Sequence, residues 1–441
     1  MTSSLAHRPA PARFRPSQEV GVVDLRWRAE ALLDDGFRLA LVTAVAEDDG
    51  AHRIVYLFTA SGPDRRVELV THTAPGGDTV PSLALLSFPA GRFERELYET
   101  HGLLASSAPP APGRNGTTGF AAPTRHSWEV DATGRAATDL VDVVEHRHPR
   151  SSLSHAVALS LAIEDANDFA VPPPVAAARA ILVELERATN HLRSIGAMCN
   201  DAGLTRWSAE ALSLHREVLT LNEEITGSRL LRGAVTPGGV RLRTLPEPRR
   251  LRELERVATE FRDKALSSPA LAATYRRRWI LTNRHAAMTG ALGPVARASG
   301  VDADARRDHP FHPGTVLVNT VTSRRGDALA RLEIRVHELG ASLRLLRDLL
   351  PEARRAVGTV SSAAFGGTGH PMRGTGLVEG PQGTIATRVE LDENGRVENL
   401  RVVDPSFLTR SAFTLSQRGP HDENGSTVDS GFDLPDPAPA H

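Results

Sequence analysis

The chain has 441 residues, of which 40% are hydrophobic and 24% charged, and its formal net charge at pH 7 is -1. This composition is typical of a globular protein with about two or three domains and a large buried core. The near-zero charge gives no electrostatic reason to expect a nucleic-acid partner or an anionic membrane surface. The single cysteine, Cys199, excludes an internal disulfide and any cysteine-built zinc or iron–sulfur site within this chain.

The N-terminus has no apolar core of the kind found in signal peptides. The sequence also has no uninterrupted run of about 18 apolar residues, so we expect no transmembrane helix. The protein is therefore expected to be cytoplasmic, or peripheral on the inner face of the cell membrane through partner subunits.

The first part of the chain, residues 1–104, predicts a small α/β module. Alternating apolar residues predict strands over 39–45, 53–58 and 66–70, because acidic and Gly/Pro-containing turns separate them. A helix is expected near 81–86. The module is then followed by a segment rich in Ser, Pro, Gly and Ala over residues 105–122, which is typical of a linker.

Residues 123–415 predict a second, helix-rich domain. Apolar residues recur at helical spacing over 175–198, 209–225, 251–261 and 328–349. Residues 384–391 and 397–403 alternate around a turn and predict two paired strands. Residues 416–441 are polar and proline-rich, so a disordered tail is expected there.

Several short blocks occur in an order and at a spacing known from one superfamily. Residues 93–98 read Phe-Glu-Arg-Glu-Leu-Tyr, and residues 379–383 read Glu-Gly-Pro-Gln-Gly. The remaining blocks are 154–156, 162–164, 171–172, 222–240, 293–311, 326–342 and 405–407. Together they resemble the nickel–iron hydrogenase large subunit and the complex I quinone-site subunit. The first block resembles the small peripheral-arm subunit of complex I, and its fusion to the larger domain is similar to the formate-hydrogenlyase-like branch.

The resemblance implies an α+β protein, in which a small N-terminal α/β module precedes a hydrogenase-large-subunit-like domain with peripheral β-hairpins. It also implies a peripheral-arm subunit of a membrane-bound complex related to complex I and energy-converting hydrogenases. The implied partners are an iron–sulfur small subunit and antiporter-like membrane subunits, with no nucleic acid and no direct membrane span. No Gly-x-Gly-x-x-Gly turn occurs between a strand and a helix, so any NADH is expected to bind another subunit.

The sequence departs from this superfamily at the metal site. The family's first pair of cysteines corresponds to His148 and Ser151, and residues 429–437 contain no counterpart of the second pair. Soft thiolates hold nickel and low-spin iron together, so we expect no metal site of this kind and no hydrogenase activity. Gln382 stands where the family has an arginine beside the metal, and glutamine lacks that charge and fork of donors.

In complex I the same cavity receives a quinone, whose carbonyl oxygens need proton donors as negative charge develops on them. The family's tyrosine donor corresponds to Leu159. By resemblance, we predict His126 and Asp201 as the catalytic proton-donating pair, and His155 and Gln382 as cofactor-binding residues. Quinone is thus the one cofactor expected at this chain, while iron–sulfur clusters belong to a partner.

Three functions remain open from the sequence. The chain either keeps a quinone site, or acts as a non-catalytic scaffold that couples the arm to an ion-translocating membrane complex. The third alternative is a soluble enzyme with a metal held by His146, His148 and His155 together with Asp201.

Several residues also have a purely structural interpretation. Cys199 is then a small core residue, His155 a core histidine, and Asp201 a helix-terminal polar residue. Asn190 and His191 are expected to be a buried helix-packing pair, and Glu94 and Glu96 to brace the module. Arg297, Arg306 and Arg307 are expected to form ion pairs at the surface, with a proton route or a contact to another subunit as the alternative.

Overall fold

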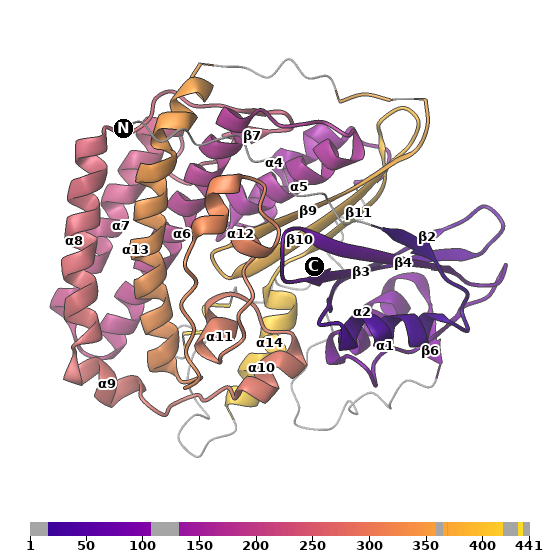
Figure 1. Ribbon diagram of the computed structural model, residues 1–441, viewed down its shortest axis with the longest axis horizontal. Coiled ribbons are helices and arrows are strands. Elements are labelled where there is room, and N and C mark those ends of the chain that lie inside the picture. Colours follow the sequence, from indigo (N-terminus) through magenta and orange to yellow (C-terminus); the bar gives the residue numbers. More distant parts are fainter. Residues whose placement is uncertain (1–15, 107–131, 359–364, 368, 418–430, 435–441) are drawn as a thin grey trace, which may run out of the picture.

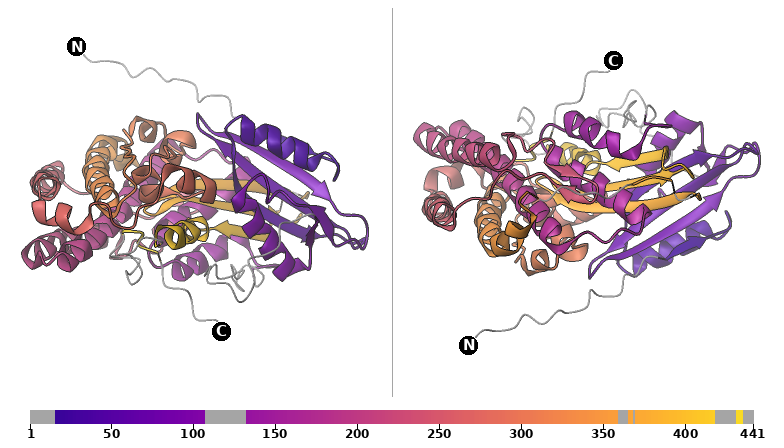
Figure 2. Two further views of the ribbon diagram at one scale, coloured as in Figure 1. Left: turned by 90° about the horizontal axis from the view of Figure 1, so that it is seen from below. Right: turned by 90° about the horizontal axis from the view of Figure 1, so that it is seen from above.

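The computed structural model describes residues 16–106, 132–358, 365–367, 369–417 and 431–434. Long helices gather at one end of the molecule and the N-terminal module at the other, with a three-stranded sheet between them (Figures 1 and 2). The predicted mixed α+β class is confirmed. Among the described helices, none is both long and apolar enough to cross a bilayer.

The N-terminal module contains a four-stranded sheet in the order β1-β4-β3-β2, with α1 and α2 on one face (Figure 1). Its three predicted strands are confirmed as β2, β3 and β4, whereas the helix expected near 81–86 is wrong. That stretch forms the end of a short strand and a turn, and the helix begins later, at Phe88, where Pro89 suits the first helical turn. The bounds are β1 (Ser17–Glu19), α1 (Leu25–Asp34), β2 (Arg38–Ala46), β3 (His52–Ala60), β4 (Arg65–His72), β5 (Thr79–Pro81), α2 (Phe88–His101) and β6 (Leu104–Ser106).

Four long helices form the opposite end of the molecule, with α13 packed on α6 and α8, and α6 packed on α7. They confirm the four predicted helical segments. Cys199 lies in their shared core with no exposed surface, which confirms its structural interpretation; burial raises the pKa of its thiol to about 11. The four helices are α6 (Pro173–Asp201), α7 (Thr205–Thr226), α8 (Pro248–Leu266) and α13 (Ala328–Ala353), and α4 (Leu140–Arg147) and α5 (Ser152–Ala166) precede them in the chain.

Shorter elements connect this bundle to the rest of the chain. They are the helices α9 (Pro269–Tyr275), α10 (Asn283–Thr289), α11 (Gly293–Ala298), α12 (Ala305–Asp308) and α14 (Ser406–Ser416), the 3-10 turns η1 (Ala137–Asp139), η2 (Pro313–Leu317) and η3 (Arg354–Ala356), and the strand pair β7 (Val235–Thr236) and β8 (Gly239–Val240). Of these, α11 and α12 carry the charged residues at the centre of the molecule.

The central sheet consists of β9 (Met372–Gly380), β10 (Gly383–Leu391) and β11 (Val397–Val403), antiparallel and in the order β11-β10-β9. Two glycines of β9 let the sheet lie directly on α5. A Cβ added at Gly374 would lie 2.1 Å from the Ala162 oxygen, and one added at Gly376 would lie 1.9 Å from the Ala158 oxygen. Any side chain at these positions would push the helix away from the strand.

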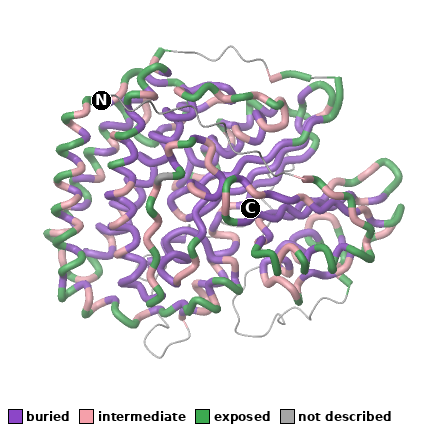
Figure 3. Tube along the Cα trace, viewed as in Figure 1, coloured by how far each residue is buried: buried purple, intermediate pink, exposed green. Residues whose placement is uncertain are grey.

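The expectation that the hairpin is peripheral is therefore wrong. Nearly every residue of β9, β10 and β11 is buried (Figure 3). The hairpin is covered on both sides, because α5 packs on it and Leu377, Ala386 and Val403 share a hydrophobic cluster with the N-terminal module.

Buried ion pairs join the module to this sheet. Arg401 of β11 donates to both carboxylate oxygens of Glu96 at 2.7 and 2.6 Å, and Arg53 of β3 donates to Glu390 at 3.0 and 2.5 Å. The module thus shares both apolar and ionic contacts with the larger part of the chain. The predicted domain boundary lies almost entirely outside the described residues and stays a prediction.

Glu94 and Glu96 both have the bracing role expected from the sequence, in two different ways. Glu94 accepts hydrogen bonds from the Ser82 hydroxyl at 2.7 Å and the Leu83 amide at 2.6 Å, within the module. Glu96 instead holds the module against Arg401 of the sheet.

The prediction of a disordered tail over 416–441 is wrong for residues 431–434. Phe432 and Leu434 are buried, and the Arg331 guanidinium lies 4.5 Å from the centre of the Phe432 ring. The Asp433 carboxylate accepts hydrogen bonds from Ser194 Oγ at 2.5 Å and Arg150 Nη1 at 2.7 Å. Two apolar side chains around one aspartate are enough to anchor this short segment despite its polar surroundings.

The Glu96–Arg401 pair generates the first prediction. Replacing Glu96 by alanine leaves a buried guanidinium without its counter-ion, so we expect the free energy of unfolding to fall by about 3 kcal/mol. Urea denaturation measures this change. The matched control is Glu260→Ala, which removes an exposed glutamate paired with Arg256; it should leave the midpoint unchanged. Equal effects of both substitutions would contradict the proposed ionic docking of the module.

Candidate functional site

Two histidines and an aspartate meet at the N-terminal end of α5. His148 directly follows α4, His155 lies in the first turn of α5, and Asp404 directly follows β11. The two imidazole rings stack with their centres 3.7 Å apart and their planes 5° from parallel. Asp404 Oδ2 lies 3.3 Å from His155 Nε2 and 3.9 Å from His148 Nδ1. We refer to these three residues as the histidine–aspartate cluster.

The backbone fixes the orientation of His155. Its Nδ1 lies 2.9 Å from the carbonyl oxygen of Ser151, so Nδ1–H donates to that carbonyl and Nε2 is directed to Asp404. Asp404 is held by its other oxygen, which accepts the Ser406 amide at 2.8 Å. A rigid histidine thus faces a rigid carboxylate in a site with little exposed surface.

The charge state of Asp404 follows from these contacts. Burial alone would raise its pKa, but the hydrogen bond from His155 and the charges of His155 and His148 outweigh burial and hold the pKa of this carboxyl well below its usual range. Asp404 therefore stays ionised and acts as a hydrogen-bond acceptor toward the imidazoles.

The cluster also offers the donor types of a metal site. One ligand atom from each of the three residues lies within 4.8 Å of the other two, and two imidazoles with a carboxylate suit zinc or non-haem iron. However, a metal binds an imidazole nitrogen in the plane of the ring, and these two planes are parallel and stacked. Joint binding would require one ring to turn, so the arrangement as it stands fits proton sharing better than metal binding.

Two buried glutamates surround the start of α5. Glu186 of α6 accepts hydrogen bonds from the Leu153 and Ser154 amides at 2.8 and 3.0 Å, and thereby caps the helix. Glu145 of α4 has no exposed surface and accepts the Gly233 amide at 2.8 Å. Burial raises the pKa of Glu145 to about 7, although the hydrogen bond from the Gly233 amide opposes this shift.

The raised pKa of Glu145 generates the second prediction. A carboxyl that binds its proton more tightly in the folded state favours folding at low pH, and this contribution is lost as the pH rises from about 4.5 to about 7. Glu145→Gln cannot ionise, so the stability of the variant relative to the unsubstituted protein should increase by up to about 3 kcal/mol over this interval.

Chemical denaturation at several pH values measures this difference. Asp139→Asn removes an exposed carboxylate just before the same helix and serves as the control, with a pH-independent effect. A constant offset between Glu145→Gln and the unsubstituted protein would show that Glu145 ionises normally.

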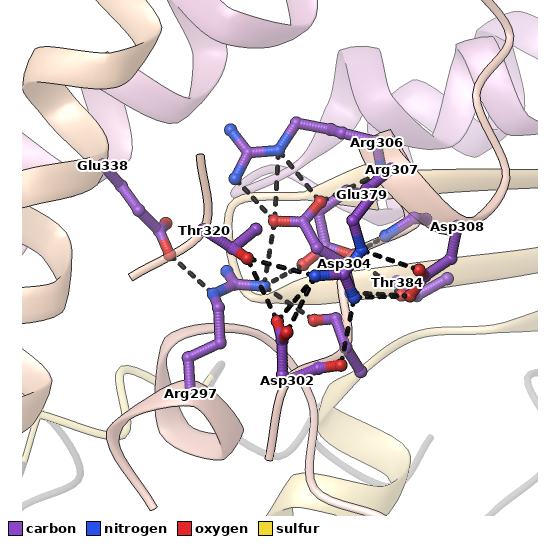
Figure 4. A network of polar contacts seen from close by, with 12 residues as sticks. Arg297, Asp302, Asp304, Arg306, Arg307, Asp308, Thr320, Glu338, Glu379 and Thr384 are labelled. Atoms are coloured by element: carbon purple, nitrogen blue, oxygen red, sulfur yellow. Dashed lines mark hydrogen bonds and ion pairs between the residues drawn. The ribbon is translucent and has the colours of Figure 1, made fainter. Parts of the chain in front are cut away.

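A larger network of buried charges lies beside the β9–β10 turn (Figure 4). At its centre, Arg297 of α11 donates from Nε to Glu338 at 2.7 Å and from Nη1 to Glu379 at 2.8 Å. Nη1 also lies 3.3 Å from Asp304. Since Glu338 belongs to α13 and Glu379 to β9, this one guanidinium connects α11 with the helical bundle and the central sheet.

The network extends to α6 through two further arginines. Arg306 pairs with Asp304 at 2.6 Å and with Glu184 at 3.3 Å. Arg187 donates to the carbonyl oxygens of Glu379 and Gly380 at 2.5 and 2.8 Å, which ties α6 to the turn between β9 and β10.

The expected surface cluster is thus wrong for Arg297 and Arg306, which are both buried, while Arg307 is partly exposed and pairs with Asp302. His191 confirms its predicted packing role, because its Nε2 lies 2.8 Å from Glu338 of α13. Burial lowers the pKa of His191 to about 4, although Glu338 opposes this shift. The ring is therefore neutral and donates Nε2–H to the carboxylate.

The four predicted site residues do not lie together in the structure. His126 lies outside the described residues. His155 belongs to the histidine–aspartate cluster. Gln382 lies in the turn between β9 and β10, with its Nε2 3.5 Å from Asn190 Oδ1 of α6. Asp201 is exposed at the C-terminal end of α6, about 22 Å of helix beyond Glu186, so the structure does not bring it to the cluster.

The proposed metal set of His146, His148, His155 and Asp201 is not assembled either. His146 is exposed on α4 and bonds within its own helix, and Asp201 lies at the far end of α6. Sequence reasoning missed Asp404 as the partner of the histidines. The sequence feature that could have identified Asp404 is its place directly after a buried strand and before Pro405, since the backbone of a residue before proline is restricted.

Comparison with known proteins finds similarity to subunits of oxidoreductase complexes. Residues 206–365 match the model of the family described as the respiratory-chain NADH dehydrogenase 49 Kd subunit. Formate hydrogenlyase subunit 5 of Escherichia coli strain K12 is 30% identical over 199 residues, which cover 44% of this chain and 35% of that protein. A subunit of the NADH-quinone oxidoreductase of Roseiflexus is 27% identical over 286 residues, which cover 61% and 76%.

Residues 206–365 are thus similar to the complex I 49 kDa subunit family, and the relatives of the chain include a formate hydrogenlyase subunit and an NADH-quinone oxidoreductase subunit. A solved structure, that of the membrane-bound sulfane sulfur reductase, an archaeal respiratory membrane complex, has a chain with the same fold. The TM-score is 0.56 at 20% identity, and the match covers 69% of this chain and 87% of that one.

The family match covers only part of the site. The matched residues 206–365 contain Arg297, Arg306 and Glu338 of the buried network, but they exclude all three members of the histidine–aspartate cluster. The chain also spans about a third of formate hydrogenlyase subunit 5. The family match thus covers part of the buried network, while the chemistry of the cluster has to be argued from its own geometry.

Proposed function

We propose that this protein is a peripheral-arm subunit of a membrane-bound oxidoreductase complex related to complex I and the energy-converting hydrogenases. The observation that carries the proposal is the family match together with the shared fold: the matched relatives include subunits of NADH-quinone oxidoreductase and of formate hydrogenlyase. A further relative is the alpha subunit of the membrane-bound hydrogenase of Pyrococcus furiosus, 29% identical over 219 residues.

The partners follow from this role. An iron–sulfur small subunit would deliver electrons, because this chain has one buried cysteine and cannot hold a cluster itself. Antiporter-like membrane subunits would attach the complex to the inner face of the cell membrane, since no described helix of this chain suits a bilayer. Any NADH would bind elsewhere in the complex.

Purification of a tagged copy from native membranes tests this role. We expect the tag to recover an iron–sulfur protein and antiporter-like membrane proteins, identified by mass spectrometry, and to lose the membrane proteins first at high salt or alkaline pH. Recovery of the tagged chain alone, in both the membrane wash and the soluble fraction, would contradict the proposal.

Hydrogen chemistry on a nickel–iron centre is not part of this function, because such a centre requires four thiolates and the chain has one cysteine. For the site itself we propose a residual quinone role, in which the histidine–aspartate cluster relays a proton toward a reduced quinone and Asp404 stabilises the imidazolium form of His155. His155 and Asp404 suit this step because one carboxylate and one backbone carbonyl fix the ring. The predicted pair of His126 and Asp201 stays a prediction.

A non-catalytic scaffold is the second candidate function. It is favoured by Leu159, which stands at the position of the family's tyrosine donor and is fully buried in α5. In that case the buried charges would serve to hold α6, α11, α13 and the β9–β10 hairpin as one body that transmits movement to the membrane part.

One pair of variants separates these two functions and forms the third prediction. In the purified complex, His155→Gln should lower quinone reduction by about 100-fold or more, since the relay loses the ring that carries the proton, while subunit composition stays the same. The matched control is His146→Gln, an exposed histidine on α4, which should retain full turnover. Unchanged turnover in His155→Gln would leave the scaffold as the function of this chain.

A further inference from the structure

A cavity of about 270 Å³ lies where the N-terminal module meets the rest of the molecule. It is lined by β2 and the start of α2 from the module, and by α10 and β10 from the larger part. The floor is apolar and buried, and includes Phe37, Leu39 and Val403. Ala287 and Met288 lie at the exposed rim. The cavity is separate from the histidine–aspartate cluster, none of whose residues line it.

One charged side chain, Arg38, lines this mostly apolar space, together with the hydroxyls of Ser87 and Thr384. Its Nε donates to Thr59 Oγ1 at 3.3 Å and its Nη2 to Thr384 Oγ1 at 3.5 Å, so both acceptors are neutral hydroxyls. Within the part of the chain that the structure describes, no carboxylate forms an ion pair with Arg38. Burial lowers the pKa of this guanidinium, although the charges of Glu379, Asp308 and Asp304 oppose the shift.

The nearby carboxylate of Glu379 does not form an ion pair with Arg38. Glu379 already accepts hydrogen bonds from Arg297, from the Ala305 amide and from the Thr384 hydroxyl. Thr384 therefore stands between Arg38 and Glu379 and uses its own proton on the carboxylate side. The guanidinium is left with unused N–H groups beside an apolar cavity, where a pair with an anion is stronger than in water.

We propose that this cavity binds a small aliphatic carboxylate, with the carboxylate paired to Arg38 and the hydrocarbon chain lying on the apolar floor. A neutral quinone would leave the charge of Arg38 unpaired, and an inorganic anion would leave the apolar walls without contacts. The volume suits a medium-chain fatty acid better than a whole lipid. The inference concerns a second site and does not depend on the proposed respiratory function.

Binding in this place would also stabilise the joint between the two parts of the chain, because the lining comes from both of them. A ligand that binds only the folded protein raises its apparent stability in proportion to the logarithm of its concentration. The cavity thus offers a route by which a carboxylate could strengthen the docking of the module on the central sheet.

Isothermal titration calorimetry on the purified full-length chain tests the proposal, with decanoate as the ligand below its micellar concentration and decan-1-ol as the neutral comparison. We expect saturable binding of decanoate, weakened at least tenfold in Arg38→Met, with little change in the affinity for decan-1-ol. The control Arg28→Met removes an exposed cation on α1 outside the cavity and should bind like the unsubstituted protein.

A second variant keeps the test independent of Arg38's structural contacts. Ala287→Trp places a large side chain at the exposed rim, and it should weaken both ligands without lowering the melting temperature. The proposal is overturned if decanoate fails to bind saturably, if Arg38→Met binds it as tightly as the unsubstituted protein, or if Arg28→Met loses as much affinity as Arg38→Met.

Discussion

The rest of the structure depends on the charges buried around Arg297. One guanidinium contacts Glu338 of α13, Glu379 of β9 and Asp304 at the start of α12, and Arg187 holds the β9–β10 turn against α6. Buried ion pairs add little net stability, because desolvation offsets their attraction, but loss of one partner is costly. Their main effect here is therefore positional: elements from widely separated parts of the chain can adopt only one mutual arrangement.

The strand β9 held by this network packs on α5 and is joined through β10 to β11, and the histidine–aspartate cluster forms at the ends of α5 and β11. The cluster itself consists of a stacked pair of imidazoles beside an ionised Asp404. Such a group can hold and pass a proton but cannot assemble a nickel–iron centre. The fold is thus shared with a chain of an archaeal respiratory membrane complex, while the cluster has the groups needed for proton transfer.

The positions of the long helices and strands could be predicted from the sequence, but which parts of the chain pack against them could not. Helical and alternating periodicity identified α6, α7, α8, α13 and the strands β2, β3, β4, β10 and β11, because each buries one regular face. Periodicity does not say what covers an element, so the hairpin was expected at the periphery and Arg297 at the surface. Asp404 and residues 431–434 were missed for the same reason: their partners, such as His155 and Ser194, lie far away in the sequence, and only tertiary packing brings them together.

The most direct test of this account is hydrogen–deuterium exchange on Arg297→Lys, read by mass spectrometry. A lysine keeps the charge but lacks the planar fork by which Nε and Nη1 of Arg297 contact Glu338 and Glu379 from two separate atoms. The account predicts that amides of β9, β10 and the start of α5 lose protection, while α7 and α8, which lie outside the network, keep theirs. Unchanged protection in β9 and β10, or a uniform loss that includes α7 and α8 equally, would contradict the claim that Arg297 positions the site.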